Sequence, residues 1–144
     1  MPPLNPLFLP SISTMIDNII ITPSVHVAVG ILVMVSTLAA TLVTGLLAWR
    51  RRGVTPLAHW VMIVAQVALM VQILIGVKLL DQGLGVLQLY IHYVGGLGAF
   101  FFFLLYYWFQ PKTPTRQGWL AFAMSTLAFL FAIQSYFIGQ AYVG

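Results

Sequence analysis

The chain contains no cysteine and no glutamate, and charged residues of either sign are scarce. The absence of cysteine excludes disulfides, iron–sulfur clusters and thiolate metal sites. Only 6% of the 144 residues are charged, whereas a soluble domain has about 25%. With 61% hydrophobic residues and a mean hydropathy of +1.01, the chain has too little polar surface for a soluble domain. The composition therefore predicts an integral membrane protein whose length allows a single domain.

Four apolar stretches are each long enough to cross a bilayer, which requires about 20 residues for about 30 Å of hydrocarbon. We expect transmembrane helices over about residues 25–49, 57–80, 86–109 and 119–142. Between them, the glycines at 83 and 85 and the prolines at 111 and 114 are expected helix breakers. Because the connections are short, neighbouring helices should be antiparallel. The predicted fold is an all-α, antiparallel four-helix bundle over residues 25–144.

The few charges predict an orientation for this bundle. Arg50, Arg51 and Arg52 lie in the first loop and Lys112 and Arg116 in the third, and loops rich in Lys and Arg stay in the cytoplasm. We therefore expect a multi-pass protein of the bacterial cytoplasmic membrane with both termini on the outer side. The net charge of +4 is too small to suggest a nucleic-acid partner.

The N-terminal segment, residues 1–24, lacks the basic start and the cleavage site of a signal peptide. Its part "STMIDNIII" is compatible with a short interfacial helix on the outer surface. An ordered tail that packs on a neighbouring subunit accounts for the same residues equally well.

Two histidines interrupt the apolar spans in the same way. "VHVAVG" places Gly30 four residues after His26, and "LYIHYVGGLG" places Gly96 four residues after His92. Residues four apart share a helix face, and the first and third helices of such a bundle are parallel and diagonal. Counted from the tryptophans, His26 should lie about seven residues, or about 10 Å, farther out than His92. One metal ion could bind both only if helix tilt or a different start of the third helix removed this offset.

A haem accounts for this pattern, because two neutral imidazoles can ligate its iron from opposite faces. Gly30 and Gly96 would leave room for the porphyrin beside each ligand, and Lys78 at the outer end of the second helix could pair with a propionate. The sequence thus predicts a haem b site with His26 and His92 as iron ligands. Simpler interpretations remain open: glycines pack membrane helices closely, and Lys78 could pair with Asp81, three residues on. His59, near the cytoplasmic end of the second helix, is interpreted as an interfacial residue.

The run "AQVALMVQILIGVKLLDQGLGVLQLYIHYVGGLGAFFFFLLYYW", residues 65–108, resembles the haem A synthase family. The matching residues are Gln72 and Gly76 on one helix, then His92 on the next, followed by the small residues Gly95 and Gly96. With His26 at the outer end of the preceding helix, the resemblance covers one four-helix half of that family's tandem bundle. In that family such paired histidines ligate haem, so the resemblance implies this role for His26 and His92.

The chain also departs from the family pattern. Pro23 and Val27 stand where the family has a glutamate and an arginine around the first histidine. The paired loop cysteines of many members and the second half of the family's bundle are missing too. The resemblance therefore implies a b-type haem site, or only the inherited helical scaffold, in place of haem A synthesis.

Two functions of different class follow. The first is a membrane subunit of a respiratory or photosynthetic electron-transfer complex that holds one b-type haem near the outer face. The second is a haem-free accessory subunit of a quinone-linked complex, with a role in packing, assembly, or shaping a quinone or lipid channel. A transporter is disfavoured, because no acidic residue lies within a span to couple ions.

The small loops favour partners among other integral membrane subunits and lipid, and a non-catalytic subunit of an oxidoreductase complex over an enzyme by itself. The side chains that could hydrogen-bond a quinone carbonyl, or merely bridge helices, are Gln66, Gln72, Gln134, Gln140, Tyr90 and Tyr136.

Overall fold

The computed structural model describes residues 18–84, 90–109 and 111–143, and all regular structure in these ranges is α-helical. Its four helices are α2 (Pro23–Trp49), α3 (Pro56–Asp81), α4 (Tyr90–Trp108) and α5 (Pro114–Val143). Each is long and apolar enough to cross a membrane. The predicted fold class is therefore confirmed, and the chain is a multi-pass membrane protein.

Three of the helices begin in the same way, with a threonine followed by proline at the first helical position. Proline suits this position because its missing N–H would have no intrahelical partner there. Thr55 also caps α3, since its hydroxyl accepts a hydrogen bond from the Ala58 N–H at 3.3 Å. The expectation that Pro114 breaks the chain before a helix starting near residue 119 was wrong. Pro114 is itself the first residue of α5.

The ends of α2 and α3 share a second device, a residue with positive φ just after the helix. Arg51 has φ 52° and Gly83 has φ 73°. In each case the following N–H turns back to a carbonyl of the last turn: Arg52 donates to Leu47 O and Leu84 to Leu79 O, both at 2.9 Å. This is the Schellman arrangement, in which a left-handed residue satisfies the last free carbonyls of the helix.

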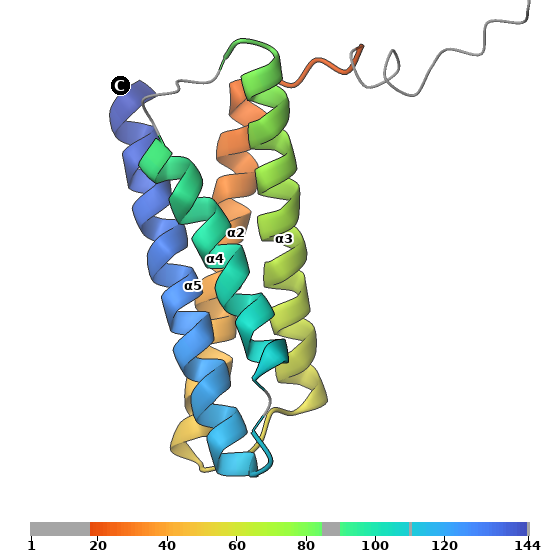
Figure 1. Cartoon of the computed structure of the whole chain (residues 1–144), viewed down its shortest axis with the longest axis vertical. Coiled ribbons are helices and arrows are strands. Elements are labelled where there is room, and N and C mark those ends of the chain that lie inside the picture. Colours follow the sequence, from red (N-terminus) through yellow and green to blue (C-terminus); the bar gives the residue numbers. More distant parts are fainter. Residues whose placement is uncertain (1–17, 85–89, 110, 144) are drawn as a thin grey trace, which may run out of the picture.

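The helices form an antiparallel bundle in which each packs on its neighbours, in the order α2, α3, α4, α5 and back to α2 (Figure 1). Helices α2 and α4 are diagonal, as predicted. The contact between α3 and α4 is much the least extensive of the four. The start of α2 and the end of α5 lie at the same end of the bundle (Figure 1). Both ends of the four-helix region therefore fall on one side of the membrane.

The core is built largely from small residues, and α5 carries the most regular series. Its inward positions recur at alternating spacings of three and four: Gly118, Ala121, Ser125, Ala128, Ala132, Ser135 and Gly139. Small residues let helix backbones approach closely in a membrane, where van der Waals packing drives association. Large apolar side chains such as Leu42, Leu74 and Phe101 point outward along the whole length of the bundle. This inverted pattern is what a lipid-facing surface requires.

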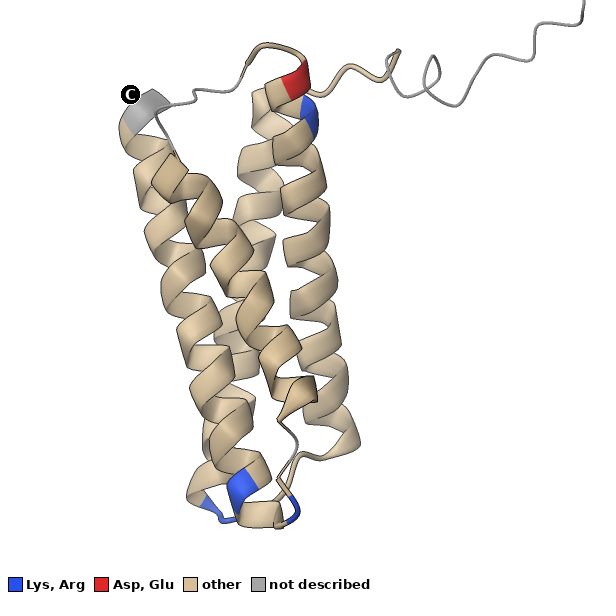
Figure 2. Ribbon diagram, viewed as in Figure 1, with Lys and Arg blue, Asp and Glu red and all other residues tan. Residues whose placement is uncertain are grey.

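Charges separate to the two ends of the bundle (Figure 2). The basic residues of the first and third loops lie at one end, where the exposed Trp49 and Trp108 end their helices. At the other end Lys78 pairs with Asp81, with Nζ and Oδ2 2.6 Å apart. The bundle therefore has one basic, tryptophan-flanked end, while which side of the membrane it faces remains a prediction.

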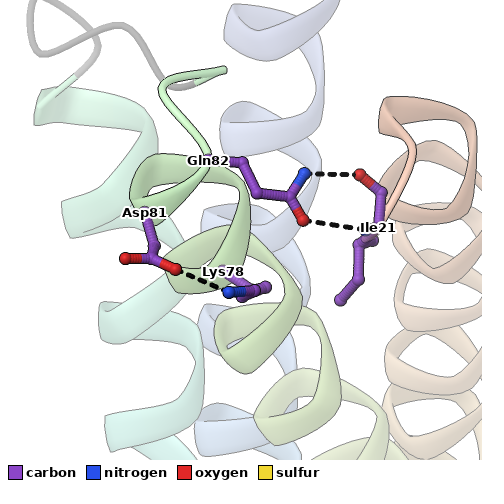
Figure 3. A network of polar contacts seen from close by, with 4 residues as sticks. All are labelled: Ile21, Lys78, Asp81 and Gln82. Carbon is purple, nitrogen blue, oxygen red and sulfur yellow. Dashed lines mark hydrogen bonds and ion pairs between the residues drawn. The ribbon is translucent and has the colours of Figure 1, made fainter. Parts of the chain in front are cut away.

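A single glutamine ties the chain before α2 to the end of α3 (Figure 3). Gln82 Oε1 accepts a hydrogen bond from the Ile21 N–H, and its Nε2 donates to the Ile21 carbonyl, both at 2.8 Å. The side-chain amide thereby pairs with the backbone as another peptide group would. The described residues 18–22 are not helical. Most of the segment suggested to be interfacial, residues 1–17, lies outside the described residues.

Candidate functional site

The side chains of His26 and His92 lie against each other inside the bundle. Their ring centroids are 5.9 Å apart and their planes are inclined by 57°. The predicted difference in depth of about 10 Å is therefore wrong. In the described chain α4 begins at Tyr90 and is 19 residues long, against 27 for α2. His26 lies in the first turn of α2, His92 is the third described residue of α4, and the two parallel helices bring these side chains to one level.

His92 is held by the facing turn of α5. Its Nδ1 lies 2.7 Å from the Ser135 carbonyl oxygen and 3.2 Å from Ser135 Oγ, which itself donates to the His92 carbonyl at 2.7 Å. Because a carbonyl oxygen can only accept, Nδ1 must carry the proton and Nε2 the lone pair. A Cβ placed on Gly139 would come within 3.2 Å of the His92 ring, so this glycine leaves the space that the ring fills.

His26 is held by α3 in a related way, through its other nitrogen. Its Nε2 lies 3.2 Å from Gln72 Nε2. A Cβ on Gly76 would come within 3.3 Å of the His26 ring. His26 Nδ1 and Gln72 Oε1 are both buried without a hydrogen-bond partner. The Gln72 amide therefore contacts Nε2 of His26, whereas the contacts of His92 with Ser135 use Nδ1 and leave its Nε2 available.

The two helical hairpins build this site as a structural repeat. In each, a histidine of one helix packs on a glycine of the next helix, and a polar residue four positions before that glycine contacts the ring. The pairs are Gln72 with Gly76 and Ser135 with Gly139. Sequence reasoning noticed the echo of His-xxx-Gly but missed the roles of Ser135 and Gly139. The matching four-residue spacing on α3 and α5 was the available signal.

A cavity of about 370 Å³ opens beside the two rings, in a bundle whose least extensive helix contact is that between α3 and α4. This lies within the range of about 300–1,000 Å³ typical of small-molecule sites. Its wall is largely apolar, with residues from all four helices. Its polar side chains are His26, Gln72, His92, Tyr93, Ser135 and Tyr136. The cavity can therefore take an apolar molecule that makes a few directed polar or metal contacts.

The predicted site glycines lie differently around this cavity. A Cβ on Gly96 would meet nothing within 4 Å, so this position faces open space. Gly30 also lines the cavity, but its Cβ would meet Gln72 Nε2 at 3.3 Å and the Tyr136 ring at 3.6 Å. Gly95 instead permits close packing on α5, where a Cβ would lie 3.0 Å from the Ser135 side chain. Only Gly96 therefore provides unfilled room of the kind a flat cofactor needs.

Lys78 is at the same end of the bundle, but its ammonium group is engaged by Asp81 (Figure 3). Its neighbours Val77 and Leu80 line the cavity, whereas Lys78 is not among the lining residues. His59 lies away from this site, near the basic end of α3, and meets the Tyr107 ring edge-on with centroids 5.7 Å apart. The structure thus unites His26, His92, Gly30 and Gly96 and leaves Lys78 at the margin.

In the part of the chain that the structure describes, no group of three or more potential metal-ligating side chains comes together. What the site offers is a pair of imidazoles, which suits axial ligation of a metal whose other ligands come from a macrocycle. No protein-family model matches the sequence, and searches of curated proteins and of solved structures return no match. The geometry of this site is therefore the basis for a proposed function.

Proposed function

We propose that this chain is an integral-membrane electron-transfer subunit that holds one b-type haem between His26 and His92. The observation that carries the proposal is the approach of these two imidazoles, from diagonal helices, to 5.9 Å at the wall of one cavity. Metal–nitrogen bonds of about 2.0 Å on both sides of an iron would separate the ring centroids by about 6 Å. An ordinary aromatic contact spans the same range, so the cavity and the free nitrogen of His92 are needed to favour ligation.

When bound, the haem supplies a one-electron couple whose potential depends on axial ligands, burial and neighbouring hydrogen bonds. His92 has the arrangement typical of a metal-ligating histidine, because its Nδ1–H is donated to a backbone carbonyl. This bond fixes the tautomer and raises the basicity of Nε2. The apolar wall would keep water from the iron, and the open face of Gly96 would accept a porphyrin edge.

The setting supports a subunit and not an independent enzyme. The loops between helices are short, and large apolar side chains cover the outer surface of the bundle. We propose that the chain works beside other integral membrane subunits of a respiratory or photosynthetic complex in the bacterial cytoplasmic membrane. The resemblance to one half of the haem A synthase family supports a bis-histidine haem bundle. Pro23 and Val27, at the departures from that family's pattern, support haem carriage without haem A synthesis.

In this proposal Lys78 pairs with a haem propionate in place of Asp81. Its side chain is only 12% exposed and its helix turn borders the cavity. A propionate would replace one carboxylate by another, so the ammonium group would stay paired.

The test is a reduced-minus-oxidised spectrum of the full chain, expressed with adequate haem supply and purified in detergent. We expect a sharp α-band of low-spin b-type haem that disappears in His92→Ala. His59→Ala is the matched control, because this third histidine is remote from the cavity, and it should keep the band. Wild-type protein without haem absorbance under these conditions would overturn the proposal.

A second candidate, a haem-free subunit that binds a quinone, rests on a different observation. Gln72 Oε1 and His26 Nδ1 are buried at the cavity without hydrogen-bond partners, and buried polar atoms usually find one. A quinol hydroxyl could donate to one of them, with the apolar ring in the cavity. Of the residues considered for this role, Gln134 and Gln140 are exposed and Tyr90 is 65% exposed. Haem-free protein that binds a quinone analogue, with binding lost in Gln72→Leu, would favour this candidate.

A further inference from the structure

The two histidines are held in unequal ways, and this inequality has a consequence for how the site works. We infer that His92 is the permanent axial ligand of the proposed haem and His26 an exchangeable one. Gln72 competes for His26, so a small external ligand such as carbon monoxide can take the second axial position. The inference rests on the proposed function. It adds that external ligands can reach the haem iron and that Gln72 controls this access.

His92 is prepared for ligation as it stands. Its Nδ1 is donated to Ser135 O, the Ser135 hydroxyl bonds back to the His92 carbonyl, and the ring edge lies on Gly139. None of these contacts uses Nε2, the atom that would bind iron. Ligation by His92 therefore breaks no hydrogen bond and needs no change of tautomer.

His26 is in the opposite situation, because Nε2 is the nitrogen that contacts Gln72. In one orientation the amide N–H donates to Nε2, and in the other the amide oxygen accepts from Nε2–H. Both orientations occupy the nitrogen needed for iron. The remaining nitrogen, Nδ1, is buried, and the Nδ1–Cε1 edge of the ring faces Gly76 on α3.

For His26 to ligate iron, its contact with Gln72 must therefore break, which leaves the amide in an apolar cavity with neither end paired. When His26 stays with Gln72, the second axial position faces the cavity. A small ligand that enters the cavity can then occupy it. Gln72 thus decides between a six-coordinate site closed by His26 and an open one.

The experiment compares wild-type chain with His26→Ala, His92→Ala and Gln72→Leu, each loaded with haem b in detergent, and follows carbon monoxide binding after reduction. We expect His92→Ala to lose the haem. His26→Ala should retain it in a five-coordinate, high-spin form that binds carbon monoxide fully. Gln72→Leu should lower the apparent carbon monoxide affinity by roughly two- to tenfold, the value of one net hydrogen bond. Gln66→Leu, the same change on the same helix outside the cavity lining, should leave it unchanged.

Equal loss of haem in both histidine variants would overturn the inference while leaving the proposed function intact. So would equal carbon monoxide affinity in wild-type and Gln72→Leu, with helicity by circular dichroism checking that each variant folds. A measurement without haem tests the inference independently of the proposed function. Nitrogen-15 spectra of the haem-free chain should show His92 with its proton on Nδ1, and a proton on Nε2 would overturn the inference. If wild-type chain takes up no haem, the proposed function itself fails.

Discussion

At the scale of single residues, the core contains buried serines that differ in hydrogen bonding: one hydroxyl has a partner and another has none. Ser135 bonds to the His92 carbonyl, whereas Ser125, fully buried on the same helix, has no partner for its hydroxyl. Both serines occupy inward positions of α5. Their difference lies only in what the facing helices present.

This difference predicts opposite effects for the same substitution. Ser135→Ala should lower the free energy of unfolding by about 0.6 kcal/mol, the average value of an interhelical hydrogen bond in a membrane. Ser125→Ala should leave it unchanged or raise it by up to about 1 kcal/mol, because an unpaired buried hydroxyl is removed. Unfolding by dodecyl sulfate in mixed micelles, followed by circular dichroism, measures both. A larger loss in Ser125→Ala than in Ser135→Ala would contradict the hydrogen-bond assignment.

Two glycines give a second prediction at this scale. A Cβ on Gly118 would collide with the Arg52 carbonyl oxygen, which belongs to backbone and cannot rotate away. Gly118→Ala should therefore cost about 1–3 kcal/mol, as overpacking does. Gly96→Ala serves as control, because a Cβ there meets nothing within 4 Å and should not destabilise the bundle. Equal destabilisation of the two variants would contradict the assignment of the loss at Gly118 to this contact.

At the scale of elements, the helices are defined by their ends more than by their apolar faces. Proline at the first position and a left-handed residue after the last fix where α2 and α3 begin and end. The two C-terminal turns differ in one respect. Gly83 adopts φ 73° without steric cost, whereas Arg51 must adopt φ 52° with a side chain.

Arg51→Gly should therefore stabilise the chain by about 1 kcal/mol, since a left-handed conformation costs a non-glycine residue about 1–2 kcal/mol. Arg50→Gly removes the same charge at a position with φ −76°, where no such strain is relieved. It should be neutral or destabilising in the same unfolding experiment. A gain of equal size in both variants would mean that charge repulsion among the arginines is the cause.

At the scale of the whole molecule, the separation of charges predicts how the bundle sits in the membrane. The basic end carries the first and third loops, and the end with Lys78 and Asp81 carries the proposed haem site (Figure 2). By the positive-inside tendency the haem site should lie near the outer face. This placement would expose the site to a donor or acceptor outside the cytoplasm.

The absence of native cysteine makes this orientation directly measurable. Leu84→Cys places a thiol at an exposed position after α3, and Thr113→Cys places one at an exposed position between α4 and α5. In intact cells a membrane-impermeant maleimide should label the first variant and not the second. Permeabilised cells should show labelling of both, which controls for reactivity. The reverse pattern in intact cells would place the proposed haem site on the cytoplasmic side.

Sequence by itself determined the architecture, because hydrocarbon admits only segments whose backbone groups are satisfied internally. Scarce charge and four long apolar runs were enough for the four membrane-spanning helices of the described residues, their antiparallel order and the diagonal placement of His26 and His92. The predicted start of the fourth helix was wrong, because Pro114 was interpreted as a helix breaker. Proline also suits the first position of a helix, and α5 begins there.

Only the tertiary structure decided that the two histidines lie at one depth, and that Ser135 and Gly139 hold one ring while Gln72 and Gly76 hold the other. These relations join residues more than 40 positions apart. They depend on how far neighbouring antiparallel helices are displaced along one another, that is, on how they slide. Periodicity reports which face of a helix is buried, but it carries no information about such sliding.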